Sequence, residues 1–380
     1  MNVLLLILGV LVLLFPNSFQ LVTAIVMILI VVLSFIINNK ICINDYLLFW
    51  WLTLSCFFIF YISISEINIQ DKIELILKYT FFPFLWLAIG TYLKENYKEE
   101  YLIKALVIFS FVSFFLVLAL YYLMLMGYNF VELFFKDPNI DNQYGLGFTL
   151  HVYGNMLFFA AGIIIIIPVL NSRLFEFFYV FMFIIVALIS ARTALLVSLS
   201  LGIIFLQLYY IYEKRYGMPL IYILILVLLF FGLSFYTSNY LNYNLIDYFQ
   251  QGSLEKFKSF GGKERTAQSG LMIQKIINNP WGIGFNNIGI IMNEEKEYKY
   301  EVLILATLLR YGLLVFTLIG FSLLPIIKTI TNFRKINSYK MFWVLGFVFI
   351  IVFSFTNPYL ESFFFQWMFF IPLVFLIDQK

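Results

Sequence analysis

The chain has 380 residues, of which 63% are hydrophobic and 12% are charged, and its net charge is +3. A soluble fold cannot cover so much apolar surface, so lipid is expected to be the solvent of this chain. The small, scattered positive charge argues against nucleic acid as a partner. Two cysteines and one histidine give no basis for a disulfide framework or a metal site, and the sequence has no nucleotide-binding motif.

Apolar runs close to 20 residues long predict membrane-spanning helices, because this helical length crosses a hydrocarbon core of about 30 Å. They predict an all-α, polytopic transmembrane helix bundle of about 12 spans, forming a single integral membrane domain over 1–380. The expected spans are 3–15, 19–37, 46–64, 79–93, 101–126, 152–170, 174–190, 194–212, 219–236, 301–324, 341–356 and 362–378.

Basic residues in short loops predict the orientation, because lysine and arginine favour the cytoplasmic side. With the N-terminus inside, the inner loops hold Lys40, Lys94, Lys98, Lys104, Arg173, Lys214, Arg215, Lys328, Arg334, Lys335, Lys340 and Lys380. The outer side, without its one long loop, holds only Lys72, Lys78, Lys136, Arg192 and Arg310. Both termini are therefore expected in the cytoplasm.

A polar stretch over 237–300 interrupts the apolar pattern and is expected to form a large extracytoplasmic loop. Within it, residues 264–277 predict a helix that ends at Asn279-Pro280. One apolar stripe marks this helix and suggests that it lies on the membrane or packs on the bundle. The stripe consists of Met272, Ile273, Ile276 and Ile277. Arg265 shares the azimuth of Met272 and should point toward the bundle.

Three charged residues near span ends are candidates for chemistry. Arg192 is either a snorkelling arginine at headgroup level or a fixed cation that binds phosphate through its planar fork. Glu301 opens a span, either as an ordinary acid at a helix N-terminus or as a general base with a raised pKa. Arg310 needs a partner or a water-filled cavity, and both an ion pair and a substrate contact remain open.

Two further polar residues complete the candidates. His151 is the only histidine and is expected to form hydrogen bonds at the interface. Glu361 follows Asn357-Pro358 at an outer span end, where it either lines the same cavity or is solvated.

Three stretches, taken in order, resemble the bacterial O-antigen polymerase and ligase family. Residues 190–195, Ser-Ala-Arg-Thr-Ala-Leu, are similar to the family's S-R-T-A-L segment. Arg265 followed by 279–287, Asn-Pro-Trp-Gly-Ile-Gly-Phe-Asn-Asn, is similar to its R…P-x-x-G-x-G-F-x-N pattern. Residues 301–305 and 310–314 are similar to the stretch after the family's large outer loop. The order of these motifs and the expected span layout extend the resemblance over the whole chain, in particular to the Wzy-type repeat-unit polymerases for O-antigen or capsule.

The resemblance implies glycan transfer at the outer face of the bacterial inner membrane. The substrates would be oligosaccharide repeat units on undecaprenyl diphosphate, joined with inversion as in the multi-span lipid-carrier glycosyltransferases. Membrane lipid and a chain-length regulator are the other implied partners, and no cofactor is implied. Glu301 would be the general base, with Arg192, Arg265 and Arg310 holding the diphosphate. Tyr300 and His151 complete the residues assigned to substrate binding.

Three other functions remain open, one of which is a polysaccharide-export or scaffold partner without catalysis. Ligases of the family usually have a histidine where this chain has Tyr300-Glu301, which favours a polymerase over a ligase. A flippase or transporter of a lipid-linked oligosaccharide would use the same arginines as a substrate track. The lack of an internal repeat and the single large outer loop argue against that alternative.

Overall fold

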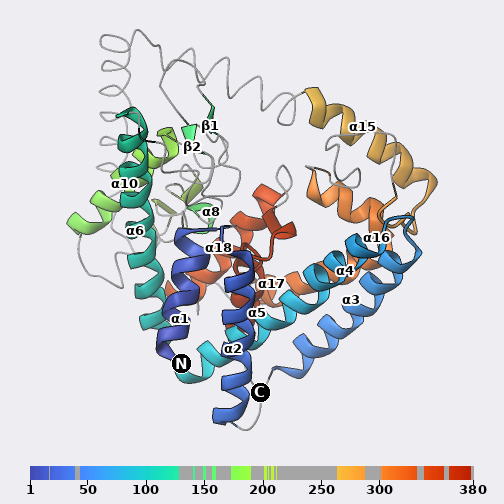
Figure 1. Ribbon diagram of the computed structural model, residues 1–380, viewed down its shortest axis with the longest axis horizontal. Coiled ribbons are helices and arrows are strands. Elements are labelled where there is room, and N and C mark those ends of the chain that lie inside the picture. The colour runs from blue at the N-terminus through green and yellow to red at the C-terminus, as the bar shows by residue number, and fades with distance from the viewer. Residues whose placement is uncertain are drawn as a thin grey trace. The chain divides into compact units, whose positions relative to one another are not determined.

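The chain is helical in almost all of the part that the computed structural model describes, with one pair of two-residue strands (Figure 1). The all-α class predicted from the sequence is confirmed. The structure describes 1–380 except residues 17, 39–42, 127, 129–139, 142–148, 151–155, 160–172, 190–200, 203, 205–206, 209–210, 212–262, 287–299, 301, 332–337, 355–358 and 378–380.

The elements follow one another along the chain in the order used in Figure 1. The α-helices are α1 (Asn2–Gly9), α2 (Gln20–Asn38), α3 (Asp45–Ile64), α4 (Ile69–Ile76), α5 (Phe82–Asn96), α6 (Glu99–Leu125), α8 (Met156–Phe159), α10 (Arg173–Ile189), α15 (Lys263–Asn278), α16 (Leu303–Gly320), α17 (Leu324–Thr331), α18 (Ser338–Ser354) and α19 (Trp367–Leu376). Short π or 3-10 segments are η1 (Val10–Leu14), η2 (Leu77–Phe81), η4 (Phe321–Leu323) and η6 (Tyr359–Glu361). Strand β1 (Ile140–Asp141) pairs antiparallel with β2 (Thr149–Leu150).

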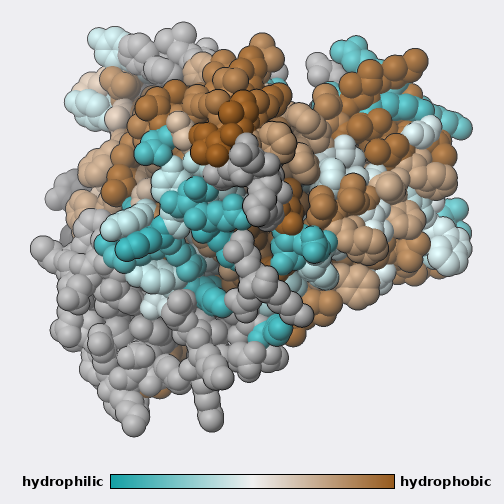
Figure 2. Space-filling model, turned by 90° about the horizontal axis from the view of Figure 1, so that it is seen from below, coloured by the Kyte–Doolittle hydropathy of each residue, from teal (hydrophilic) through white to brown (hydrophobic). Residues whose placement is uncertain are grey.

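Within the described residues, five helical stretches are long and apolar enough to cross a membrane, so the chain is a multi-pass membrane protein. These stretches are Gln20–Ile37, Asp45–Ile64, Ile69–Asn96, Glu99–Leu123 and Leu303–Leu323. Large apolar side chains remain exposed along them, as expected for surfaces that face lipid. Figure 2 shows brown hydrophobic surface over much of the described part of one face. The total of about 12 spans stays a prediction, because several expected spans lie partly or wholly outside the described residues.

The chain forms two compact units, which are described separately. The first comprises Met1–Val12, Phe19–Ile103 and Phe260–Lys380, and the second comprises Leu13–Ser18 and Lys104–Ser259. In the second unit, Tyr179 of α10 packs edge-on against Phe111 and Phe114 of α6 and donates a hydrogen bond of 3.1 Å to the Phe159 carbonyl. The candidate site belongs entirely to the first unit.

Helices α5, α18 and α19 form the aromatic core of the first unit. The buried Trp343 of α18 stacks on Phe375 of α19 at 4.7 Å between ring centroids. Trp86 of α5 donates from its indole Nε1 to the Phe363 carbonyl at 2.8 Å. Gly90 lets α5 approach α19 closely, because a Cβ there would lie 3.2 Å from Val374. This packing fixes the segment before α19, which carries Glu361.

A π-helical turn, η2, separates α4 from α5. The Phe82 N–H reaches back to the Leu77 carbonyl, as the wider π pattern requires. In the same pattern the Lys78 carbonyl would need the N–H of residue 83, which is a proline and has none. The Gln366 Nε2 donates to that carbonyl instead, at 3.0 Å. The turn therefore ties Lys78 and its neighbour Tyr79 to the segment before α19.

Helices α3 and α16 run antiparallel, as contacts along their length show. At the start of α3, the Tyr46 hydroxyl donates to the Phe321 carbonyl at 2.9 Å. One turn further, the Trp50 indole donates to the Leu318 carbonyl at 2.8 Å. Toward the other end, the Phe58 ring packs against Tyr311 of α16 at 4.7 Å between ring centroids, and Ser65 Oγ, just after α3, accepts from the Phe285 N–H at 2.7 Å. Because α3 rises about 30 Å over its length, these contacts mark the two sides of the hydrocarbon core.

Helix α15 confirms the helix predicted within the long loop, and it packs on α16. Its predicted apolar stripe divides into two. Met272 is fully buried with Ile276 against Tyr300, Ala306 and Leu309. Ile273 and Ile277 are exposed instead. The helix therefore packs on the bundle through half of the stripe only.

Candidate functional site

A buried cluster of one acid and two bases lies between η2, α16 and η6. Arg310 Nη1 lies 2.6 Å from Glu361 Oε1, and Lys78 Nζ lies 3.4 Å from Glu361 Oε2. Arg310 is 1% exposed and Glu361 is 9% exposed, so the pair is largely removed from water. One carboxylate thus binds a cation at each of its oxygens. Charges buried in this way are held only when such partners are close.

The two cations control the ionisation of Glu361, which lies between α18 and α19. Burial alone would raise the pKa of its carboxyl, but Lys78 and Arg310 lower the pKa to about 2. Glu361 is therefore a carboxylate at neutral pH. A group with so low a pKa is a poor general base, so its role is to hold the cations.

Aromatic rings enclose the guanidinium of Arg310. Its Cζ lies 4.7 Å from the centroid of the Phe285 ring and 5.5 Å from that of Tyr300. Arg310 Nη1 also donates to the Tyr79 hydroxyl, at 3.4 Å. Cation–π contacts strengthen when water is excluded, as it is around a side chain buried to this degree. The arginine is thereby fixed in position as well as in charge.

Helix α16 is broken at Gly312, whose φ of 72° and ψ of 179° are not helical. The break removes the intrahelical hydrogen-bond partners of nearby backbone N–H and C=O groups. Leaving such groups unpaired in an apolar environment costs free energy. The segment 280–284 replaces them. The Pro280 carbonyl accepts from Leu313 N at 2.9 Å, while Ile283 N and Gly284 N donate to the carbonyls of Leu309 and Arg310, each at 2.9 Å.

Glycines make this pairing possible. A Cβ on Gly282 would lie 2.6 Å from Gly312 N, and a Cβ on Gly312 would lie 2.3 Å from the Trp281 carbonyl carbon. Both residues also have positive φ, which favours glycine. The two backbones therefore touch without side chains between them. This contact holds the end of the long loop against the turn of α16 that carries Arg310.

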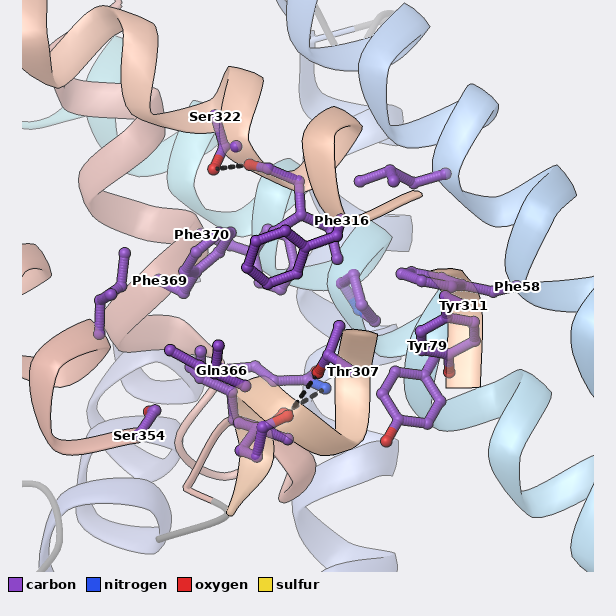
Figure 3. Close-up of a pocket in the computed structure, with 18 of the residues that line it drawn as sticks. Phe58, Tyr79, Thr307, Tyr311, Phe316, Ser322, Ser354, Gln366, Phe369 and Phe370 are labelled. Carbon is purple, nitrogen blue, oxygen red and sulfur yellow. Dashed lines mark hydrogen bonds between the residues drawn. The ribbon is translucent and has the colours of Figure 1, made fainter. Parts of the chain in front are cut away.

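An apolar cavity of about 290 Å³ begins beside this cluster and extends along the bundle (Figure 3). Tyr79, Tyr311 and Phe58 gather at one end of it, and Phe369, Phe370 and Ser354 lie toward the other. On α3 its lining runs from Trp50 to Phe58, a rise of about 12 Å at 1.5 Å per residue. The cavity thus covers a substantial part of the thickness of the hydrocarbon core.

The serine and threonine side chains in the lining add little polarity to the cavity, because their hydroxyls donate to nearby carbonyls. Thr307 donates to the Leu303 carbonyl at 2.8 Å, and Ser354 donates to the Ile350 carbonyl at 2.6 Å. Ser322 donates to the Ile319 carbonyl at 2.6 Å. A cavity with such a lining suits a hydrocarbon chain. The end of the cavity at Tyr79 and Tyr311 suits the part of such a ligand that extends from the hydrocarbon chain toward Lys78 and Arg310.

The structure brings together two of the residues predicted from the sequence, Arg310 and Tyr300. Arg310, for which an ion pair and a substrate contact were both open, is paired with Glu361. Arg265 belongs to α15, but its side chain lies outside the described part, as do residues Arg192, His151 and Glu301. The expected span from 301 to 324 is in fact a helix that begins at Leu303 and breaks at Gly312.

Lys78, Tyr79 and Gln366 were not among the predicted site residues. Lys78 was counted only as an outer-loop charge, because the expected span began at residue 79. In the structure the helical path starts at Ile69, so Lys78 lies inside a membrane-spanning stretch. A lysine five residues before Pro83 in an apolar run is the signal that could have identified it. Glu361, for which two roles were open, is the partner of both cations.

Among the described residues, no three His, Cys, Asp or Glu side chains lie close enough together to hold a metal ion. In comparisons with family models, curated proteins and solved structures, the chain matches none.

Proposed function

We propose that the chain is a polymerase that joins oligosaccharide repeat units carried on undecaprenyl diphosphate into O-antigen or capsular polysaccharide. The observation that carries the proposal is an apolar cavity lined at one end by Tyr79, whose hydroxyl accepts a hydrogen bond from Arg310 of the Lys78–Glu361–Arg310 cluster. A lipid-diphosphate substrate needs a hydrocarbon-binding space next to fixed cations. The ordered sequence motifs supply the choice of glycan transfer among the reactions that such a lipid could undergo.

The proposed reaction is an inverting displacement at the anomeric carbon. A hydroxyl oxygen of the acceptor glycan forms a bond to that carbon while the bond to the diphosphate oxygen breaks. The diphosphate leaves with the bonding electron pair, and Glu301 takes the hydroxyl proton. Arg192 and Arg265 are the proposed cations for the charge that develops on the leaving group, because an arginine fork binds phosphate oxygens in pairs.

Arg310 takes a different role in the proposal from the one expected from the sequence alone. Its guanidinium is bound by Glu361 and enclosed by rings, so it positions the site instead of gripping the diphosphate directly. Lys78, which is more exposed than either Arg310 or Glu361, is the better placed of the two cations to meet an anionic group at the cavity end.

A strain that lacks its polymerase, complemented with this chain, tests the proposal through the ladder of glycan lengths. Glu301→Gln keeps the size of the side chain but cannot accept a proton. Because general-base assistance is typically worth ~10²–10⁴-fold, this variant should yield single repeat units and almost no ladder. Glu297→Gln, in an acidic run of the loop, is the matched control and should yield a normal ladder.

The other outcomes separate the alternatives. A normal ladder from Glu301→Gln at equal membrane abundance would reject Glu301 as the base. Export of carrier-linked repeat units restored by this chain in a strain that lacks its flippase would favour a flippase. Transfer of polymer to lipid A core restored by this chain in a strain that lacks its ligase would favour a ligase.

A further inference from the structure

Helix α15 has a second apolar surface that its packing on α16 leaves uncovered. Ile273, Ile277 and, just beyond the helix, Trp281 are 47%, 72% and 73% exposed. These are three large apolar side chains at successive intervals of four residues. We propose that they form a membrane-surface anchor, in which this edge of α15 lies in the boundary between lipid headgroups and acyl chains.

The rotation of α15 is fixed by its buried face. Gln268 and Met272 are fully buried, and Met272 packs against Tyr300, Ala306 and Leu309. At 100° per residue, Ile273 and Ile277 lie within 40° of each other on one flank of the exposed arc. Gln274 is exposed near the middle of this arc, and Lys275 is exposed on the opposite flank together with Leu271, which is 40% exposed. The exposed side of the helix thus has one wholly apolar edge, formed by Ile273 and Ile277, and one mixed edge.

The depth of this apolar edge in the membrane follows from contacts that residues just after α15 make with α3. The Tyr61 hydroxyl donates to the Trp281 carbonyl, and Ser65, the residue that caps the end of α3, binds the Phe285 N–H. Since α3 is a membrane-spanning helix, its end marks one boundary of the hydrocarbon core. Trp281 therefore lies at that boundary, where tryptophan and tyrosine are enriched in membrane proteins.

The apolar edge is continuous with surface that already faces lipid. Leu313 follows the glycine that touches the Trp281 backbone, and its N–H is bound to the Pro280 carbonyl. Leu313 and Leu314 on α16 are exposed, as are Phe60 and Ile64 near the end of α3. In Figure 1, α15 lies beside α16 near the end of α3. This continuity selects lipid as the occupant over water or a protein partner.

The anchor has a structural consequence that does not depend on the proposed chemistry. Helix α15 and the segment 280–284 are adjacent in the chain, and that segment holds the break in α16. If the apolar edge lies in the membrane surface, it fixes the position of α15 along the membrane normal. The neighbouring turn of α16 that carries Arg310 is then fixed as well. The segment 280–284 is thereby held at the bilayer boundary.

Nitroxide labels test the anchor in the full-length protein. In a Cys42→Ser, Cys56→Ser background, Ile277→Cys and the matched control Lys275→Cys are labelled and reconstituted into vesicles of phosphatidylethanolamine and phosphatidylglycerol. Collisions with oxygen, which concentrates in hydrocarbon, are compared with collisions with a water-soluble nickel chelate. The oxygen-to-nickel ratio should be several-fold higher at 277 than at 275.

Equal ratios at the two positions would overturn the proposal. Exclusion of both reagents from 277, with broadening between labels on separate molecules, would overturn it in favour of contact with a second copy. Quenching of tryptophan fluorescence by lipids brominated near the headgroup gives an independent readout. Trp281→Phe should remove part of that quenching, and unchanged quenching would contradict the anchor.

Discussion

The role of Arg310 is decided by the residues around it and not by its position in an apolar span. A guanidinium 2.6 Å from a carboxylate and enclosed by two rings has its interactions determined within the protein. The effect of mutating such a pair on stability depends on whether one partner or both are replaced. Removing one partner leaves an uncompensated buried charge, whereas replacing both with uncharged groups of similar size is often close to neutral.

This asymmetry predicts the outcome of two variants at the cluster. Glu361→Ala should lower the free energy of unfolding by about 3–5 kcal/mol, because it leaves Arg310 buried without its carboxylate. The double variant Arg310→Met, Glu361→Gln should recover most of that loss. Thermal unfolding of the purified protein in detergent measures both. If the cluster also positions substrate, the double variant should be stable and still form no ladder.

The same variants test the acid dependence of the cluster. The folded-state pKa of Glu361, about 2, lies below the ordinary value of 4.5, so its stabilisation is fully present above pH 4.5. It is lost as the pH falls from there through about 2. The stability difference between wild type and Glu361→Ala should therefore be the same at pH 7 and pH 5. A difference that already disappears at pH 5 would show that the carboxyl is not held by its cations.

At the scale of elements, the break in α16 at Gly312 separates Arg310 from the rest of the helix. After Gly312 the helix continues from Leu313 toward the start of α3, where Tyr46 and Trp50 bind the carbonyls of Phe321 and Leu318. Arg310 lies before this stretch, level with the end of α3. The arginine is thus at the rim of the membrane, where a buried charge is less costly than at its centre.

Glycine substitutions test whether the break is built by backbone contact. Gly312→Ala places a Cβ 2.3 Å from the Trp281 carbonyl carbon at a φ of 72°, and should cost at least about 1–3 kcal/mol of stability. Gly320→Ala is the matched control in the same helix, since nothing lies within 4 Å of its added Cβ. That variant should be neutral or slightly more stable. Equal unfolding temperatures for the two variants would mean that the loop does not touch α16 at Gly312.

How far the sequence predicts these elements depends on whether the signal is local. The apolar run at 46–64 predicts α3 within a residue, and the helix at 264–277 predicts α15, because length, periodicity and a following proline are local signals. The break at Gly312 depends on Gly282, which is distant in the chain and supplies the backbone partner. Likewise Lys78 and Glu361 meet only in the folded chain. No local pattern carries these pairings.

At the scale of the whole molecule, the structure adds a constraint on the orientation predicted from basic residues. The start of α3 and Phe321 of η4 lie on one side of the membrane, because Tyr46 binds the Phe321 carbonyl. The end of α3 and Phe285 lie on the other side. In the sequence, Lys328, Arg334 and Lys335 follow Phe321, and Lys40 precedes α3. The positive-inside rule therefore predicts that the side of Tyr46 and Phe321 is cytoplasmic.

Reporter fusions along the full chain test this orientation. Fusions at Lys214, Lys335 and Lys380 should be active with a reporter that works only in the cytoplasm, such as β-galactosidase. Fusions at Gly252 and Asn293 should be active with alkaline phosphatase, which works only outside. The prediction follows from the twelve basic residues in the expected inner loops against five in the outer ones, and from the shared side of Phe321 and Tyr46. Each site carries both reporters in turn, so that a silent fusion is distinguished from a misplaced one.

Cytoplasmic activity at Gly252 together with external activity at Lys335 would mean that the orientation is the opposite of the predicted one. The Lys78–Glu361–Arg310 cluster would then lie at the inner face, where transfer between outward-facing glycans could not take place.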